Sequence, residues 1–258
     1  LTGGVYAQSE DDIERLCAEL RCGNLYVNRP NTAARVAIEP FGGFLMSGTG
    51  PKAGGVQYLD AFYAPTPVAG KDADWGDMVA SAAAAVGKVV TAQTPTRQIP
   101  GQENHNRWDV PRGNVVVLAE SQQASAHVRA HIATATAAGN RATVFATGAS
   151  LATLRALLSG HTGATVHDLN EEDELDRVLL DPDLATVVCD GPIYRWRPHL
   201  ERTPKPSKRR HLWQILDRPR SPACDDWQAL AKCHLSVRTI VINTMRHGAP
   251  LTIDSGPA

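Results

Sequence analysis

A glycine-rich stretch at residues 47–55, SGTGPKAGG, has the composition of a loop that binds a ligand through its backbone. Three structures are typical of such a loop: a cradle for nucleotide phosphates, a plain turn, and a pocket of backbone N–H groups for a small anion. Residues 48–53 fit the dinucleotide pattern G-x-G-x-x-A, but Pro51 and the pair Gly54–Gly55 interrupt the helix that this pattern must open. Lys52 is also misplaced for a P-loop.

The anion pocket is therefore the favoured interpretation of the glycine-rich stretch. Successive glycines let main-chain N–H groups converge on one carboxylate, because no Cβ atoms stand in the way. Phe62, seven residues after Gly55, can supply an apolar wall for the rest of the ligand.

Other catalytic and metal-binding patterns are missing from the sequence. It contains no G-x-S-x-G, no H-E-x-x-H and no cluster of cysteine and histidine with the spacing of a metal site. Cys224 with Cys233 and His234 can be interpreted as zinc ligands, but two unrelated buried thiols are the simpler interpretation. We expect no catalytic residue, no cofactor-binding residue and no metal ligand in this chain.

Composition is that of an ordinary globular protein, and it limits the classes of partner. The chain has 258 residues and a net charge of −1, so its surface as a whole does not attract nucleic acid. Five cysteines without paired spacing indicate free thiols in a reducing compartment, the cytoplasm, with any membrane contact peripheral. The basic segment 195–222 is interpreted as a solvated loop around one short helix rather than a nucleic-acid patch.

The pattern along the chain predicts two α/β blocks. In the first, a helix begins after Ser9 and ends at Gly23, a strand follows at 24–28, and residues 64–70 form a linker. In the second, strands alternate with helices, which implies a doubly wound parallel sheet. Its expected strands are 114–120, 142–147, 164–169 and 184–190, with helices at 122–138, 150–160 and 171–180, before a final strand at 235–244.

Four segments of the first block resemble a known family. The sequences LTGGVY (1–6), GNLYVNRP (23–30), PFGGF (40–44) and SGTGPKAGG together resemble the last part of the aldehyde dehydrogenase catalytic domain. More narrowly, they are similar to the L-glutamate γ-semialdehyde (Δ1-pyrroline-5-carboxylate) dehydrogenases. In that family the glycine loop holds the substrate's α-carboxylate and amino group. The resemblance implies that Gly54 and Gly55 are the anchoring amides and that Phe62 packs against the substrate's aliphatic chain.

The second block resembles a degenerate copy of a nucleotide-binding domain. Residues 99–121 and 136–148 are similar to the start of the aldehyde dehydrogenase cofactor domain, and 238–251 to a closing motif of the long proline utilization A proteins. Those proteins join an FAD-dependent proline dehydrogenase to an NAD-dependent semialdehyde dehydrogenase. SQQAS (121–125) and Ala146–Thr147 replace the family's cofactor-binding residues, so we expect no NAD site in residues 71–234. VAIEPFGGF also departs from the usual residues before PFGG.

The resemblance implies four parts: the end of a catalytic domain (1–63), a linker and connecting helix (64–98), a degenerate Rossmann-like domain (99–234), and a closing strand with the C-terminal motif (235–258). The catalytic cysteine, the NAD site and the FAD-binding part would precede Leu1, so the chain alone would be an inactive fragment. The expected partners are L-glutamate γ-semialdehyde, the upstream part of the enzyme and, through residues 235–246, another subunit of a homo-oligomer. The alternatives are a free-standing interaction scaffold and, with less support, a nucleic-acid-binding segment at 195–222.

Overall fold

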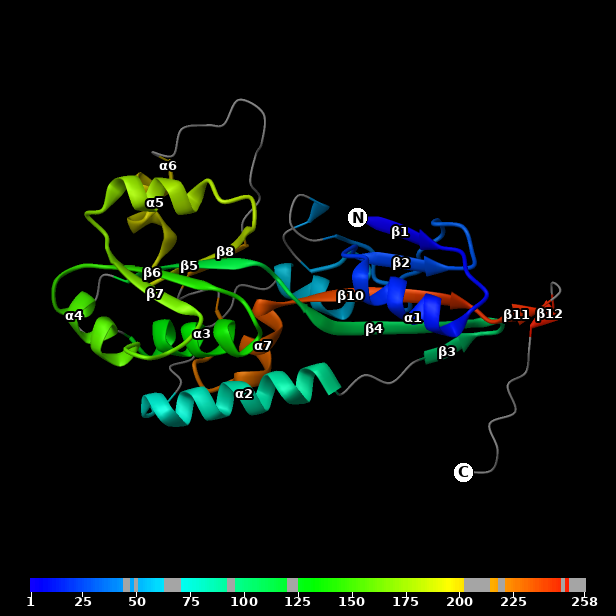
Figure 1. Ribbon diagram of the computed structural model, residues 1–258, viewed down its shortest axis with the longest axis horizontal. Coiled ribbons are helices and arrows are strands. Elements are labelled where there is room, and N and C mark those ends of the chain that lie inside the picture. Colours follow the sequence, from blue (N-terminus) through cyan, green and yellow to red (C-terminus); the bar gives the residue numbers. More distant parts are fainter. Residues whose placement is uncertain are drawn as a thin grey trace. The chain divides into compact units, whose positions relative to one another are not determined.

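The computed structural model describes residues 1–43, 47–48, 51–62, 71–91, 96–119, 125–201, 214–217, 221–246 and 249–250 (Figure 1). The chain forms two compact units. Unit 1 comprises residues 1–62, 92–110 and 237–258, and unit 2 comprises residues 63–91 and 111–236. The four-part division implied by the resemblance stays a prediction. No helix in the described part of the chain is long and apolar enough to cross a membrane.

Unit 1 is built around a five-stranded sheet with the order β1-β2-β10-β4-β3. Strands β1 and β10 both pair in parallel with β2, so that Asn24 of β2 faces Thr2 on one side and Thr239 on the other. Strand β3 pairs antiparallel with β4, and β11 with β12. The strands are β1 Thr2–Val5, β2 Asn24–Val27, β3 Thr96–Ile99, β4 Gln102–Pro111, β10 Leu235–Asn243, β11 Met245–Arg246 and β12 Ala249–Pro250.

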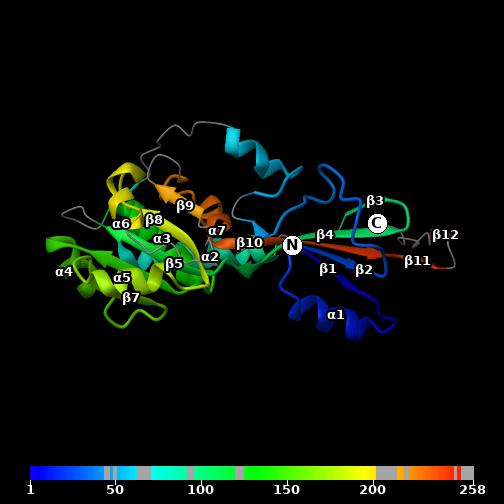
Figure 2. The same ribbon diagram turned by 90° about the horizontal axis from the view of Figure 1, so that it is seen from above.

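Helix α1 (Glu10–Glu19) lies on one face of this sheet (Figure 2). Its N-terminus is capped as the sequence predicts, because Ser9 Oγ accepts a hydrogen bond of 3.3 Å from the Asp12 N–H. Cys17 of α1 belongs to the buried core of unit 1 with strand residues such as Val5, Leu25 and Ile240. The predicted end at Gly23 is wrong: Leu20 already has extended backbone angles and caps the helix.

Unit 2 has a five-stranded, fully parallel sheet with the order β7-β6-β5-β8-β9. The order reverses between β5 and β8, as in a doubly wound fold, and helices cover both faces (Figure 1). The predicted α/β class and parallel sheet are confirmed. Strands β5 Asn114–Ala119, β6 Ala142–Ala146, β7 Ala164–Asp168, β8 Leu184–Cys189 and β9 Gln214–Asp217 alternate with helices α3 Ala126–Ala137, α4 Gly148–Leu157, α5 Glu172–Leu179, α6 Arg197–Glu201 and α7 Trp227–His234, and α2 Trp75–Thr91 precedes them.

The buried strand β5 explains why this sheet lies between two helical layers. Its side chains alternate between two hydrophobic cores. Val115 and Val117 pack in one core with residues of α3 and α4, while Val116 and Leu118 pack in the other with residues of α5 and β8. A strand that is apolar on both faces has to be covered on both faces, which is the arrangement typical of parallel sheets.

Strands β4 and β9 are among those that were not predicted. Strand β4 has ten residues but no apolar alternation, and it carries buried polar side chains such as Gln102 and Asn104. Strand β9 lies inside the basic segment 195–222, for which a solvated loop with one short helix was expected. Helix α6 is that short helix, whereas residues 202–213 and 218–220, like the predicted linker 64–70, lie outside the described residues.

Candidate functional site

The described part of the glycine loop, residues 51–55, is held against residues 36–42 by backbone hydrogen bonds. Ala53 and Phe41 exchange two of them, at 2.8 and 2.9 Å, and the Ala37 N–H donates to Gly54 O at 2.7 Å. The two segments therefore form one small folded unit. The loop presents a fixed backbone conformation rather than an open chain.

Both predicted anchor glycines occupy positions that a side chain would disturb. Gly54 has a φ of +73°, and a Cβ there would come within 3.2 Å of Val36 Cα. A Cβ on Gly55 would lie 3.1 Å from Pro40 Cβ. The Gly55 N–H closes a turn to Lys52 O at 3.1 Å, while the Gly54 N–H donates to no acceptor within the described residues. Gly54 therefore offers a backbone donor that no described group occupies.

Phe62 lies at the far end of the 3₁₀ helix Val56–Phe62, which Gly55 opens by accepting a hydrogen bond from the Tyr58 N–H at 3.0 Å. The Phe62 side chain is 72% exposed, and its ring contacts Tyr58 edge-on, with 5.5 Å between centroids. Seven residues of 3₁₀ helix rise roughly 14 Å. The structure brings Gly54 and Gly55 together but leaves Phe62 at a distance from them along this helix.

Lys52 is the residue of this loop that the sequence analysis missed as a functional candidate. Its side chain is buried, and Nζ donates to Gly23 O, to Thr239 Oγ1 at 3.0 Å and to Asn24 Oδ1 at 3.3 Å. Within the described residues it forms no ion pair. Burial lowers the pKa of Lys52 to about 7, so the ammonium group titrates in the neutral range.

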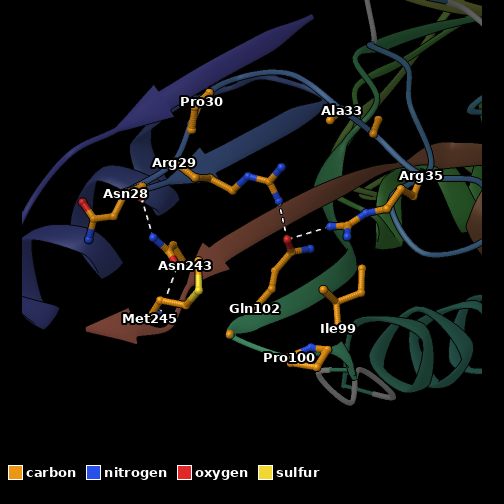
Figure 3. A pocket seen from close by; sticks show the side chains of 12 residues that line it. Asn28, Arg29, Pro30, Ala33, Arg35, Ile99, Pro100, Gln102, Asn243 and Met245 are labelled. Atoms are coloured by element: carbon orange, nitrogen blue, oxygen red, sulfur yellow. Dashed lines mark hydrogen bonds between the residues drawn. The ribbon is translucent and has the colours of Figure 1, made fainter. Parts of the chain in front are cut away.

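A hollow of about 490 Å³ lies between residues 28–35, the turn at 99–102 and the end of β10 (Figure 3). Residues 28–35 directly precede the segment 36–42 that pairs with the glycine loop. Figure 3 shows Arg29 and Arg35 converging on the side-chain oxygen of Gln102. The Gln102 amide in turn donates to Glu39 and, at 2.6 Å, to Asn104. Glu39 also pairs with Arg35 at 2.5 Å, so its carboxylate compensates one of the two guanidinium charges, and the cluster ties β4 to residues 29–39.

The segment before PFGG contains unusual backbone angles. Ala33 and Ala37 have φ values of 67° and 64°, in the left-handed region that glycine adopts without strain. Ala37 lies in VAIEPFGGF, where the sequence departs from the family's usual residues. The departure therefore coincides with local strain next to the glycine loop.

The strand order of unit 2 reverses between β5 and β8, and doubly wound sheets bind ligands at such a point. Asp190, which follows β8, is 8% exposed and accepts a hydrogen bond of 2.9 Å from Ser125 Oγ, the N-cap of α3. A buried carboxylate thus occupies the helix N-terminus that would receive a phosphate. Its negative charge opposes a dinucleotide pyrophosphate, so these residues do not fit NAD.

Three histidines gather in the core of unit 2. His131 Nδ1 lies 2.9 Å from His234 Nε2, its Nε2 lies 3.1 Å from Ser221 Oγ, and its ring packs on His127 with 4.6 Å between centroids. Burial lowers the pKa of His131 well below its usual value and that of His234 to about 3. Within the described residues no group of three metal-ligating side chains could hold a metal ion. His131 and His234 are therefore neutral imidazoles that share a hydrogen bond.

The five cysteines are all free. Burial raises the pKa of every one of these thiols, to about 12 at Cys189 and about 11 at Cys233. Since the thiolate is the nucleophile, thiols that stay protonated at neutral pH are poor candidates for covalent catalysis.

Comparison with known proteins places the first part of the chain. Residues 1–68 match the Aldehyde dehydrogenase family, which confirms the resemblance predicted for this region. A 1-pyrroline-5-carboxylate dehydrogenase of Oceanobacillus iheyensis is 52% identical over 62 residues, covering 24% of this chain and 12% of that protein. The Bifunctional protein PutA of Rhizobium meliloti is 43% identical over 68 residues, covering 26% of this chain and 6% of that protein.

A solved structure matches nearly the whole fold. Proline Utilization A (PutA) from Corynebacterium freiburgense superimposes with a TM-score of 0.56 at 18% identity, covering 96% of this chain and 23% of that one. At this identity the likeness concerns the fold, including that of unit 2. The chain spans about a tenth or less of the length of the two sequence relatives it matches.

Proposed function

We propose that this chain is the C-terminal portion of an NAD-dependent L-glutamate γ-semialdehyde dehydrogenase of the proline utilization A type. The parent enzyme oxidises the semialdehyde to glutamate in proline catabolism. The names of the two sequence relatives support this assignment for residues 1–68. The catalytic thiol, the site for NAD and an FAD-dependent proline dehydrogenase part belong to the parent outside this chain.

In this proposal the chain supplies the anchor for the substrate's α-carboxylate. The observation that carries it is the free N–H of Gly54 in a loop whose conformation is fixed by Ala37 and Ala53. A backbone N–H that is already oriented holds an anion without paying to order the loop. The Gly55 N–H joins it when the carboxylate replaces Lys52 O as acceptor, and Phe62 covers the aliphatic chain. Anchoring the carboxylate keeps the aldehyde carbon near the nucleophile.

The anchor is tested with Gly55→Val in the full-length enzyme, assayed on the semialdehyde and on a simple aliphatic aldehyde without a carboxylate. A valine Cβ would lie 3.1 Å from Pro40 Cβ and 3.2 Å from Lys52 O, so the loop would have to shift. We expect KM for the semialdehyde to rise roughly tenfold or more, with KM for the plain aldehyde and kcat nearly unchanged. Gly87→Val is the matched control, because a Cβ on Gly87 of α2 meets nothing within 4 Å. Equal effects on both substrates would contradict an anchor role.

Unit 2 is assigned a non-catalytic, covering role over the dehydrogenase active site and the passage from the proline-oxidising site. Asp190 at the N-terminus of α3 supports the loss of NAD binding. Deletion of residues 112–234 with a short linker in the full-length enzyme retains β4, β10 and helix α2, and it removes the parallel sheet of unit 2 with its other helices. Coupled turnover of proline to glutamate should fall while the separate dehydrogenase activity persists. Unchanged coupled activity and assembly would favour the alternative, an interaction scaffold. Homo-oligomerisation through residues 235–246 belongs to the same proposal.

A further inference from the structure

The buried ammonium group of Lys52 joins three separate segments of unit 1. Its three hydrogens match three acceptors: Gly23 O before β2, Asn24 Oδ1 at the start of β2, and Thr239 Oγ1 in β10. The glycine loop is thereby tied to a strand 187 residues further along the chain. An apolar side chain of the same length would remove this shared donor and break the tie between the three segments, although Gly23 O keeps the Thr239 N–H and Asn24 Oδ1 keeps the Gly42 N–H as donors.

The backbone of Lys52 also stabilises the glycine loop that forms the anchor. Lys52 O accepts the turn-closing hydrogen bond from the Gly55 N–H, and Ala53 pairs with Phe41. The acceptors of Lys52 are themselves fixed: Asn24 donates to Pro40 O at 3.0 Å and accepts from the Gly42 N–H at 3.1 Å. Both sides of the glycine loop, the segment 40–42 and the residues 53–55, thus depend on one network.

We propose that Lys52 is a positioning residue for the carboxylate anchor, whose ammonium group holds the amides of Gly54 and Gly55 in the orientation that receives the substrate. This inference rests on the proposed function of the glycine loop. Lys52 acts through the loop and does not itself touch the substrate. A neutral amine retains two hydrogens for three acceptors, so deprotonation releases one of the three ties.

The groups around Lys52 are uncharged, so they do not compensate for a change in its protonation state. The Cys22 thiol is the titratable group that faces it, and that thiol stays neutral because burial raises its pKa. The remaining neighbours, the Gly23 carbonyl, the Asn24 amide and the Thr239 hydroxyl, carry no charge. With a pKa of about 7, Lys52 loses its proton as the pH rises through neutrality. Carboxylate affinity should therefore weaken above about pH 7.

The test measures the competitive inhibition constant of L-glutamate, the product, in the full-length enzyme between about pH 6 and pH 9. In the unmodified enzyme it should rise roughly fivefold across this range, the equivalent of one hydrogen bond. In Lys52→Met it should be roughly tenfold higher at pH 6 and independent of pH, with kcat on a simple aliphatic aldehyde unchanged. Lys88→Met, an exposed lysine of α2, is the control and should keep the original profile.

Three variants separate the possible failures. If Gly55→Val weakens glutamate binding but Lys52→Met leaves both the constant and its pH profile unchanged, the positioning role is wrong. If Gly55→Val has no effect either, the anchor itself is wrong. Should Lys52→Met fail to fold, Thr239→Val removes one acceptor and keeps the lysine. It should weaken binding roughly threefold at pH 6, and an unchanged constant with an unchanged profile in this variant would overturn the inference.

Discussion

Acidification should destabilise unit 2 through its histidine cluster. His131 and His234 are buried, hydrogen-bonded to each other and neutral in the folded protein. In the unfolded chain both rings are in water and bind a proton at about pH 6.5. Below that pH the unfolded state binds more protons than the folded state, so the free energy of unfolding falls.

The size of the effect follows from the pKa of His234. Because the folded-state value is about 3, the loss begins below about pH 6.5 and continues down to about pH 3. Each pH unit in this window lowers the free energy of unfolding by about 1.4 kcal/mol for one histidine. At pH 5 His234 alone should therefore account for a loss of about 2 kcal/mol. His131 adds a loss of the same sign, since its pKa is also depressed.

The assay is urea denaturation of this chain between about pH 8 and pH 5, combined with hydrogen exchange of the α3 amides to localise the transition to unit 2. The variant His234→Gln keeps a polar side chain that does not titrate, and it should reduce the loss at pH 5 by about 2 kcal/mol. His167→Asn, at the sheet edge strand β7 with a side chain that is 27% exposed, is the matched control. A free energy of unfolding that is independent of pH, or an equal pH dependence in His234→Gln, would refute the reasoning.

Two further predictions concern the stability of unit 1, measured by urea denaturation of the same chain. Ala37→Gly should raise the free energy of unfolding of unit 1 by about 0.5–1 kcal/mol by relieving the left-handed backbone strain. The comparison variant Ala83→Gly, on the exposed side of α2 in unit 2, should lower the free energy of unfolding of unit 2 by about 1 kcal/mol. A loss at Ala37 would contradict the assigned strain. Asp109→Asn should lower the free energy of unfolding by about 3 kcal/mol, because Arg238, whose side chain is 7% exposed, would lose its carboxylate partner at 2.6 Å. A change within about 0.5 kcal/mol would show that the Cys17 carbonyl alone satisfies Arg238.

The sequence was most informative where a segment is buried by its own neighbours. In unit 2 the apolar runs of β5 and β8 and the helices between them follow from local composition, and the parallel sheet follows from their alternation. Strand β4 escaped prediction because its buried side chains are polar. Gln102 is stabilised by partners in residues 29–39, and Asn104 by Gln102, and no period within β4 reveals these contacts.

In the candidate site, too, some residues can be predicted from local sequence and others depend on distant contacts. Glycine residues in a loop indicate binding through the backbone, so Gly54 and Gly55 could be selected as candidate site residues from the sequence alone. Lys52 could not, because the role proposed for it depends on Asn24 and Thr239, which lie 28 and 187 residues away. A lysine in a glycine-rich loop is ordinarily solvated, and only the parallel pairing of β2 with β10 encloses it.

The position of β10 also orders events during synthesis. Strand β2 is completed at Val27, but its neighbour β10 spans Leu235–Asn243, and all of unit 2 is encoded between them. On the ribosome unit 2 can therefore fold while one edge of β2 is still unpaired. The loss of chain entropy that accompanies the pairing of β2 with the distant β10 comes last, because β10 is synthesised after unit 2. Any stop in translation before Leu235 leaves that edge of β2 unpaired and open to pairing with other chains. Lys52 therefore acquires Thr239 as a hydrogen-bond acceptor only in chains that have been synthesised beyond residue 239.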